Sequence, residues 1–257
     1  MLRLVDINKY YNPGTVNEMC LFNGFNLNVE EGEFVSVVGS NGSGKTSMLN
    51  IICGSIPIDN GRIEIGEIDI TDMPEYKRQM RIGRVYQNPA LGTCPHMTIL
   101  ENMSLADNKG RTFNLRRGTD KKRIGQYKDD LKRLGLGLED KLDVTVGSLS
   151  GGQRQALAMI MATMTPIEFL ILDEHTAALD PKTAELIMEL TGAIVKEKKL
   201  TTIMVTHNLR YAVEYGSRLL MMHQGDIVMD TSGEEKKVLK VDDILDKFNE
   251  ISIECGN

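Results

Sequence analysis

The sequence predicts an α/β fold with a mostly parallel sheet, an N-terminal antiparallel β subdomain and an inserted α-helical subdomain. Two observations support this prediction. Apolar runs of strand length alternate with helical segments over much of the chain, and the segment from about 88 to 146 loses strand-like runs and gains polar helical ones. We therefore expect one domain over residues 1–230, with the helical subdomain inserted at about 88–146, and a C-terminal tail over 231–257.

The N-terminal part of the chain is predicted to be rich in β structure. The turn signal Asp59-Asn60-Gly61 precedes a short alternating segment. A helix from Gly44 to about Cys53 should follow a near-continuous apolar run that is typical of a buried strand. The expected strands, in chain order, are Leu2–Ile7, Phe25–Val29, that buried run Phe34–Val38, and Arg62–Ile65.

Strands and helices alternate again after the inserted subdomain. We expect, in order, a helix from Gly151, a strand from Phe169, a helix over about 181–198, a strand over Thr202–Thr206, a short helix, and two strands that end near Asp230. In the tail, Val241, Ile244, Leu245 and Phe248 recur at helical spacing, which predicts a short amphipathic helix.

The composition is that of a soluble globular protein. The 257-residue chain is 41% hydrophobic and 26% charged. It has no apolar run near the roughly eighteen residues that a membrane-spanning helix needs, and its first residues show no signal-peptide pattern. The net charge of −6 argues against a nucleic-acid partner. Four scattered cysteines favour a reducing compartment.

A glycine-rich loop follows the predicted buried strand and matches the pattern G-x-x-x-x-G-K-[ST]. Its glycines would let backbone N–H groups cradle phosphates, helped by the N-terminus of the next helix. Lys45 would reach the β- and γ-phosphates, and the Thr46 hydroxyl would bind Mg²⁺. The loop alone predicts only a nucleotide with Mg²⁺, and the candidate nucleotide-binding residues are Gly39, Ser40, Asn41, Gly42, Ser43, Gly44, Lys45, Thr46 and Ser47.

Two adjacent carboxylates end the predicted strand that begins at Phe169. Asp173 is at the strand end, where a carboxylate can hold the Mg²⁺ shell. Glu174 projects differently from the same end, so we assign it as the general base that polarises the attacking water. Taken alone, such a pair is more often a helix cap, and the phosphate loop upstream favours the catalytic interpretation.

Between these two features lies Leu149-Ser150-Gly151-Gly152-Gln153. The three together resemble the ATP-binding-cassette (ABC) ATPases, a branch of the P-loop NTPases and the motor subunits of ABC transporters. The resemblance implies that two cassettes pair head to tail. Each signature segment, Ser150, Gly151, Gly152 and Gln153, would then close over the ATP held by the other chain. The alternative interpretation of Ser150 is an ordinary helix N-cap.

Further residues fall where the resemblance places functional groups. Gln87 is similar to the glutamine that touches Mg²⁺ and water, and His207 to the switch histidine at the γ-phosphate. Asp180 resembles the family's loop residue at the dimer interface. Tyr11 matches the aromatic residue that stacks on adenine, although the adjacent Tyr10 leaves that choice open. The resemblance therefore assigns Glu174, His207 and Gln87 to catalysis, and Thr46, Gln87 and Asp173 to the metal.

The chain also departs from the common family pattern. His175 stands where proline is usual, and Ala156 and Met161 replace arginines that are frequent after the signature. The His175 variant resembles a subgroup of bacterial importer ATPases whose members accompany a permease and a substrate-binding lipoprotein of the amino-acid-uptake kind. That implies a cytoplasmic subunit bound peripherally at the inner face of the membrane.

Several alternatives stay open at this point. The chain could serve an exporter, or be a soluble ABC ATPase of an assembly or maintenance system. A kinase or GTPase would leave the signature segment without a role. A basic cluster at 111–123 could face anionic lipids or a permease loop, or simply be a solvated face: Arg111, Arg116, Arg117, Lys121, Lys122 and Arg123.

Overall fold

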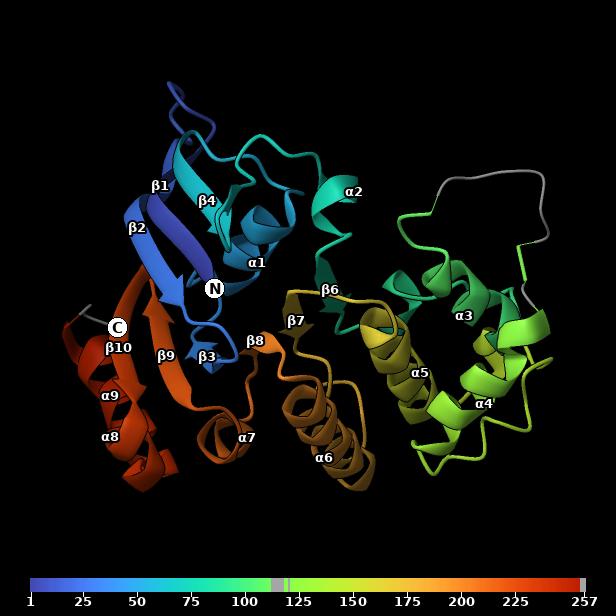
Figure 1. Ribbon diagram of the computed structural model, residues 1–257. Helices are drawn as coiled ribbons and strands as arrows, with labels where there is room; N and C mark the ends of the chain where they lie inside the picture. Colours follow the sequence, from blue (N-terminus) through green and yellow to red (C-terminus); the bar gives the residue numbers. More distant parts are fainter. Residues whose placement is uncertain (112–117, 120, 255–257) are drawn as a thin grey trace. The chain divides into compact units, whose positions relative to one another are not determined.

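The computed structural model describes residues 1–111, 118–119 and 121–254. The chain divides into two compact units (Figure 1). Unit 1 is Met1–Asp72 together with the segment from Thr201 onward, and unit 2 is Met73–Leu200.

The N-terminal part of unit 1 is an antiparallel sheet with the strand order β2-β1-β4-β5. Burial alternates in β1 from Leu2 to Leu4 and, after a register shift between Leu4 and Ile7, again from Ile7 to Lys9. Leu2 faces Val29 in β2 and Ile65 in β4. This period-2 burial gives the sheet one apolar face. The predicted antiparallel β subdomain is confirmed, with three strands longer than expected, β1 Leu2–Tyr11, β2 Met19–Val29 and β4 Asn60–Ile65, and a short strand that was not predicted, β5 Ile68–Asp69.

The remaining strands of unit 1 lie in the order β10-β9-β3-β8. Strand β3 is parallel to both of its neighbours, and all of its residues are buried, as expected for an apolar run in the middle of a sheet. Helix α1 is the next element after β3 and is separated from it by a short loop. The bounds are β3 Phe34–Gly39, α1 Lys45–Cys53, β8 Thr201–Val205, α7 Leu209–Glu214, β9 Arg218–His223, β10 Asp226–Ser232, α8 Gly233–Val238 and α9 Val241–Glu254.

Helix α9 contributes to the core of unit 1. Ile244 and Ile251 are buried in a cluster with Val38 of β3 and Leu219 and Met221 of β9. Phe248 packs against the same cluster, whereas Leu245 is 44% exposed. The predicted tail helix is therefore present, and one side of its apolar stripe faces solvent.

Unit 2 contains one pair of parallel strands, β6 and β7, with Val85 opposite Leu172. Over 88–146 the described residues form helical segments and a single isolated bridge, Thr98 to Thr145. Unit 2 is longer than the predicted helical subdomain, whose limits stay a prediction. Its elements are α2 Glu75–Arg78, β6 Ile82–Val85, η1 Pro89–Leu91, α3 Ile99–Asp107, η2 Lys121–Arg123, α4 Ile124–Lys132, η3 Val146–Ser148, α5 Gly151–Thr163, β7 Phe169–Asp173 and α6 Pro181–Lys198.

Among the described residues, no helix is both long and apolar enough to cross a membrane. The longest helix, α6, alternates buried and charged positions, which is the pattern of a helix that packs one face on a protein core.

Candidate functional site

The glycine-rich loop of unit 1 connects β3 to α1, and its geometry requires glycine at two points. At Gly44 the φ angle is +99°, and an added Cβ would lie 3.1 Å from the Phe22 ring. At Gly39 an added Cβ would lie 2.3 Å from the carbonyl oxygen of Met222. A larger residue at either point would change the path of the loop.

Lys45 is folded into this loop. Its ammonium is almost fully buried and donates to the carbonyl oxygens of Gly39, at 2.8 Å, and Ser40, at 2.9 Å. Helix α1 begins after Gly44, which offers no capping side chain, and its first turn has no acidic residue. The backbone N–H groups at the start of α1 therefore lie close to the Lys45 ammonium. Both kinds of group favour the binding of an anion. The exposed Thr46 and half-buried Ser47 lie in that first turn.

A neighbouring hairpin supports the loop. The backbone N–H of Gly225, in the turn between β9 and β10, donates to the carbonyl of Ser43 at 3.1 Å. Gly225 has a φ of +85°, and an added Cβ would lie only 1.9 Å from the carbonyl oxygen of Leu21. This turn was not predicted from the sequence, in which Gly225, a residue that favours turns, was the available signal.

His207 lies beside the loop at the same edge of the sheet. Strands β3 and β8 are parallel, and the N–H of Thr206 donates to the carbonyl of Val37 at 3.1 Å. The hydroxyl of Thr206 accepts from the N–H of Asn208 at 3.0 Å, which fixes the backbone on both sides of His207. The imidazole itself is exposed. The structure thus brings His207 and the phosphate loop together at the carboxyl ends of neighbouring strands, where α/β proteins bind ligands.

Tyr11 ends β1, with the Lys9 ammonium 5.7 Å from the centre of its ring. Lys9 pairs with Asp59 at 3.0 Å. The pKa of Asp59 is lowered, first because the N–H of Tyr10 donates to it and then because of Lys9. Tyr10 and Tyr11 point to opposite faces of the strand. The stacking of Tyr11 on the adenine base stays a prediction.

In unit 2, the other predicted catalytic and metal-binding residues lie at or just after the carboxyl ends of β6 and β7. The Asp173 carboxylate accepts from the Arg84 guanidinium at 2.7 Å, and both side chains are nearly buried. Arg84 also lies 4.6 Å from the centre of the Tyr86 ring. The Asp173 carboxylate therefore lies at the strand end beside a nearly buried cation.

Gln87 follows β6, and Glu174 follows β7, so the parallel pairing places both at one edge of the strand pair. The carbonyl of Tyr86 accepts from the side-chain amide of Gln155 at 3.1 Å. Gln155 is buried in α5 and ties this helix to the segment that carries Gln87. In the sequence, the position of Gln155 two residues after the signature segment was the only indication of this role.

The signature segment opens α5. Ser150 caps the helix, since its hydroxyl accepts from the N–H of Gln153 at 3.2 Å while the Gln153 side chain accepts from the N–H of Ser150. This is the N-cap interpretation, and a further role towards nucleotide stays a prediction. An added Cβ at Gly152 would lie 2.2 Å from Cγ2 of Thr183 in α6. The N–H of Thr183 donates to Asp180 at 3.0 Å, so the signature helix and Asp180 share one packed corner.

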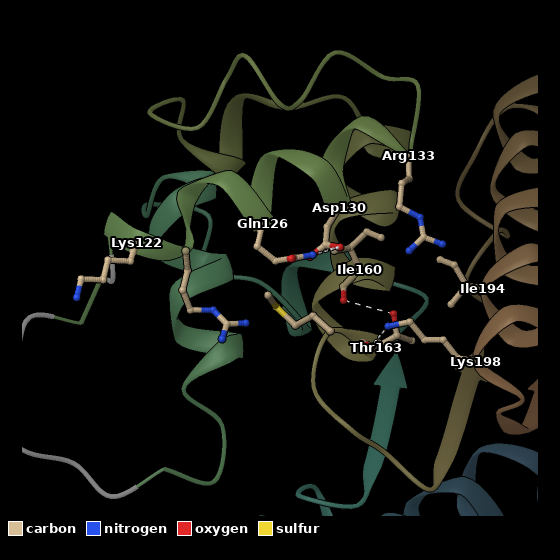
Figure 2. A pocket seen from close by; sticks show the side chains of 10 residues that line it. Lys122, Gln126, Asp130, Arg133, Ile160, Thr163, Ile194 and Lys198 are labelled. Atoms are coloured by element: carbon tan, nitrogen blue, oxygen red, sulfur yellow. Dashed lines mark hydrogen bonds between the residues drawn. The ribbon is translucent and has the colours of Figure 1, made fainter.

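A basic pocket of about 430 Å³ lies among α4, α5 and α6 (Figure 2). Its charges are engaged within unit 2: Arg123 pairs with Asp107, Arg133 pairs with Glu197, and Lys198 donates to the carbonyl of Thr163. Of the basic cluster singled out in the sequence, Lys122 and Arg123 line this pocket. Arg116 and Arg117 of that cluster lie outside the described residues.

The predicted metal-binding residues have the chemistry to bind Mg²⁺ that arrives together with a nucleotide. In the described part of the chain, no three His, Cys, Asp or Glu side chains are grouped to hold a metal by themselves. Mg²⁺ characteristically takes one or two protein oxygens together with phosphate oxygens and waters. The hydroxyl of Thr46 and the carboxylate of Asp173 are oxygen donors of that kind.

The family model described as ABC transporter matches residues 22–177, which include the phosphate loop, the signature and the acidic strand end. This chain belongs to the ABC transporter family. It is an ATP-binding subunit of an ABC transporter and an ATPase, as the resemblance in its motifs predicted.

Individual proteins similar to this ABC cassette agree with that membership. The tyrosine transport ATP-binding protein of Clostridioides difficile is 48% identical over 241 residues, which cover 94% of each chain. The phosphonates import ATP-binding protein PhnC of Lactococcus lactis is 29% identical and covers 96% of this chain and 98% of its own. The dimeric post-hydrolysis structure of the cassette MJ0796, bound to ADP and Pi, is 31% identical over 90% of this chain and 98% of that one, with a TM-score of 0.77.

Proposed function

We propose that this ABC cassette binds ATP and Mg²⁺, pairs head to tail with a second cassette, and drives a separate membrane permease that imports an amino acid or a similar small solute. The observation that carries the nucleotide assignment is the buried Lys45 at the uncapped start of α1. A preformed loop of this kind has the shape and charge for a polyphosphate.

The residues of unit 1 bind and orient the nucleotide in this proposal. Lys45 and the loop N–H groups hold the β- and γ-phosphates, with Gly39, Ser40, Asn41, Gly42, Ser43, Gly44 and Ser47 forming the cradle. Tyr11 stacks on the base. His207 donates to the γ-phosphate from its exposed position beside the loop. Thr46 of unit 1, with Asp173 and Gln87 of unit 2, would hold Mg²⁺, and the bound ion would neutralise charge on the phosphates.

Glu174 is the proposed general base. Its carboxylate accepts a hydrogen bond from the attacking water and takes a proton from it as the water oxygen bonds to the γ-phosphorus. The bond between that phosphorus and the oxygen that bridges the β- and γ-phosphates breaks, so that ADP and phosphate are the products. Ser150, Gly151, Gly152 and Gln153 of one cassette close over the nucleotide of the other, and Asp180 lies at that interface. Hydrolysis removes the γ-phosphate, which both cassettes contact in this proposal, so hydrolysis allows the two cassettes to separate.

The assignment to amino-acid import rests on similarity. The relative that is 48% identical over nearly its whole length is named for tyrosine transport, and a relative of lower identity is named for import. We infer from these a cytoplasmic subunit at the inner face of the membrane that works with a permease and a substrate-binding protein. The net charge of −6 argues against a nucleic-acid partner, and we propose none.

The decisive experiment pairs two variants. Lys45→Ala should abolish ATP binding measured by calorimetry, whereas Glu174→Gln should bind ATP and hydrolyse none. ATP affinity within a few-fold of wild type in Lys45→Ala would refute the loop assignment. Tagged Glu174→Gln with ATP should then recover a polytopic permease from native membranes. Recovery of soluble proteins alone would favour the assembly-factor alternative.

A further inference from the structure

His175 is a buried imidazole placed directly after the proposed catalytic base. Its side chain is 2% exposed, in the turn that connects β7 to α6. Its Nε2 lies 3.1 Å from Oγ1 of Thr191, a fully buried residue in the third turn of α6. A buried polar ring of this kind is stabilised only when it is hydrogen-bonded, so this contact is structurally important.

The direction of the hydrogen bond follows from its neighbour. The Thr191 hydroxyl also contacts the carbonyl oxygen of Ile187 at 2.7 Å, and a carbonyl can only accept. A hydroxyl has one proton, so Thr191 donates to Ile187 and accepts from His175. The imidazole therefore carries its proton on Nε2. The result is a chain of two hydrogen bonds, from imidazole to hydroxyl to the backbone of α6.

The backbone that this chain holds is strained. Glu174 has a φ of +46°, in the left-handed region that a residue with a Cβ adopts at a cost of about 1 kcal/mol or more. Its carbonyl accepts from the N–H of Ala177 at 2.9 Å, which closes a tight turn immediately after the strand. His175 places its side chain inside the unit next to this turn, so the ring can hold the turn in place.

We propose that His175 is a positioning residue, which holds the turn of Glu174 against α6 through its hydrogen bond to Thr191. The inference deepens the proposed function and rests on it, since it takes Glu174 as the group that orients the attacking water. The direction of the carboxylate depends on the backbone at 174, and misplacement by about 1 Å can cost up to a hundredfold in rate.

The test removes the hydrogen bond from either end and restores it with a matched variant. His175→Leu removes the donor, and His175→Gln keeps an N–H near the position of Nε2. Thr191→Val removes the acceptor, and Thr191→Ser keeps it. We expect His175→Leu and Thr191→Val to lower kcat for ATP hydrolysis about tenfold with KM for ATP changed less than about twofold, and the two matched variants to recover most of kcat.

Folding is separated from positioning by two measurements. The active fraction of each variant is counted by stoichiometric nucleotide binding, and rates are taken well below the melting temperature. The double variant His175→Leu/Thr191→Val should lose no more kcat than either single variant, because one bond is removed in all three. Wild-type kcat per active site in His175→Leu, or additive losses in the double variant, would overturn the inference.

Glu174→Gln, assayed in parallel, distinguishes the two possible failures. If Glu174→Gln is inactive while His175→Leu is fully active, the base assignment stands and the positioning role fails. If Glu174→Gln hydrolyses ATP at the wild-type rate, the proposed function of Glu174 fails whatever the His175 variants do.

Discussion

At the scale of single residues, burial sets the charge of His175. Removal from water lowers its pKa to about 4, because burial disfavours the charged imidazolium. The ordinary value for histidine is about 6.5. Between these pH values the unfolded chain binds a proton that the folded chain does not.

This difference predicts how stability depends on pH. The contribution of His175 is complete above pH 6.5 and is lost as the pH falls towards 4, to a total of about 3 kcal/mol. Urea denaturation of wild type and His175→Gln at several pH values between 4 and 7 measures it. The stability gap between the two proteins should shrink on acidification. A gap that stays constant across this range would show that His175 has the same pKa in the folded and unfolded protein.

At the scale of elements, the packing of α5 on α6 distinguishes two adjacent signature glycines. An added Cβ at Gly152 would overlap Thr183, whereas one at Gly151 would lie 3.5 Å from Leu179, an ordinary contact. Gly152→Ala should therefore lower the free energy of unfolding by about 1–3 kcal/mol, and Gly151→Ala should leave it nearly unchanged. Chemical denaturation checks both. Equal stabilities would mean that the helices can separate at no cost.

Helix α9 offers a second matched pair. Ile244 is fully buried and Leu245, its neighbour, is 44% exposed. Ile244→Ala should cost about 2–4 kcal/mol and Leu245→Ala less than about 1. Thermal denaturation of the two variants compares them directly. A loss at Leu245 as large as that at Ile244 would indicate that the exposed face is covered in solution.

The same elements show what could be predicted from sequence. Strand β3, helix α1 and helix α6 were predicted to within a residue or so, because apolar runs and caps such as Asp180 are local signals. The extension of β1 to Tyr11 was missed, since its outer residues gain strand geometry from pairing with β2. Gln155 and Arg84 were missed for a related reason: each acts on a residue distant in sequence.

At the scale of the whole molecule, the prediction concerns assembly. Glu174→Gln should double its mass in ATP and Mg²⁺, because the nucleotide would be held by the loop of one cassette and the signature of another. Light scattering after size exclusion measures this. Lys45→Ala is the control that should stay monomeric in ATP. A Glu174→Gln protein that remains a monomer at saturating ATP would require a different partner to complete the site.

The bonds of Lys45 inside its own loop also have a kinetic consequence. Because the ammonium already bonds the carbonyls of Gly39 and Ser40, the loop keeps its shape before any phosphate arrives. When a phosphate binds, its oxygens replace the two carbonyl oxygens as acceptors of the Lys45 ammonium, which is already in position. Binding therefore requires little ordering of the chain, whereas closing a mobile loop on a ligand usually costs conformational entropy. Nucleotide association should accordingly be fast and nearly independent of solvent viscosity beyond the effect of diffusion, and departure should leave the loop ready for the next encounter.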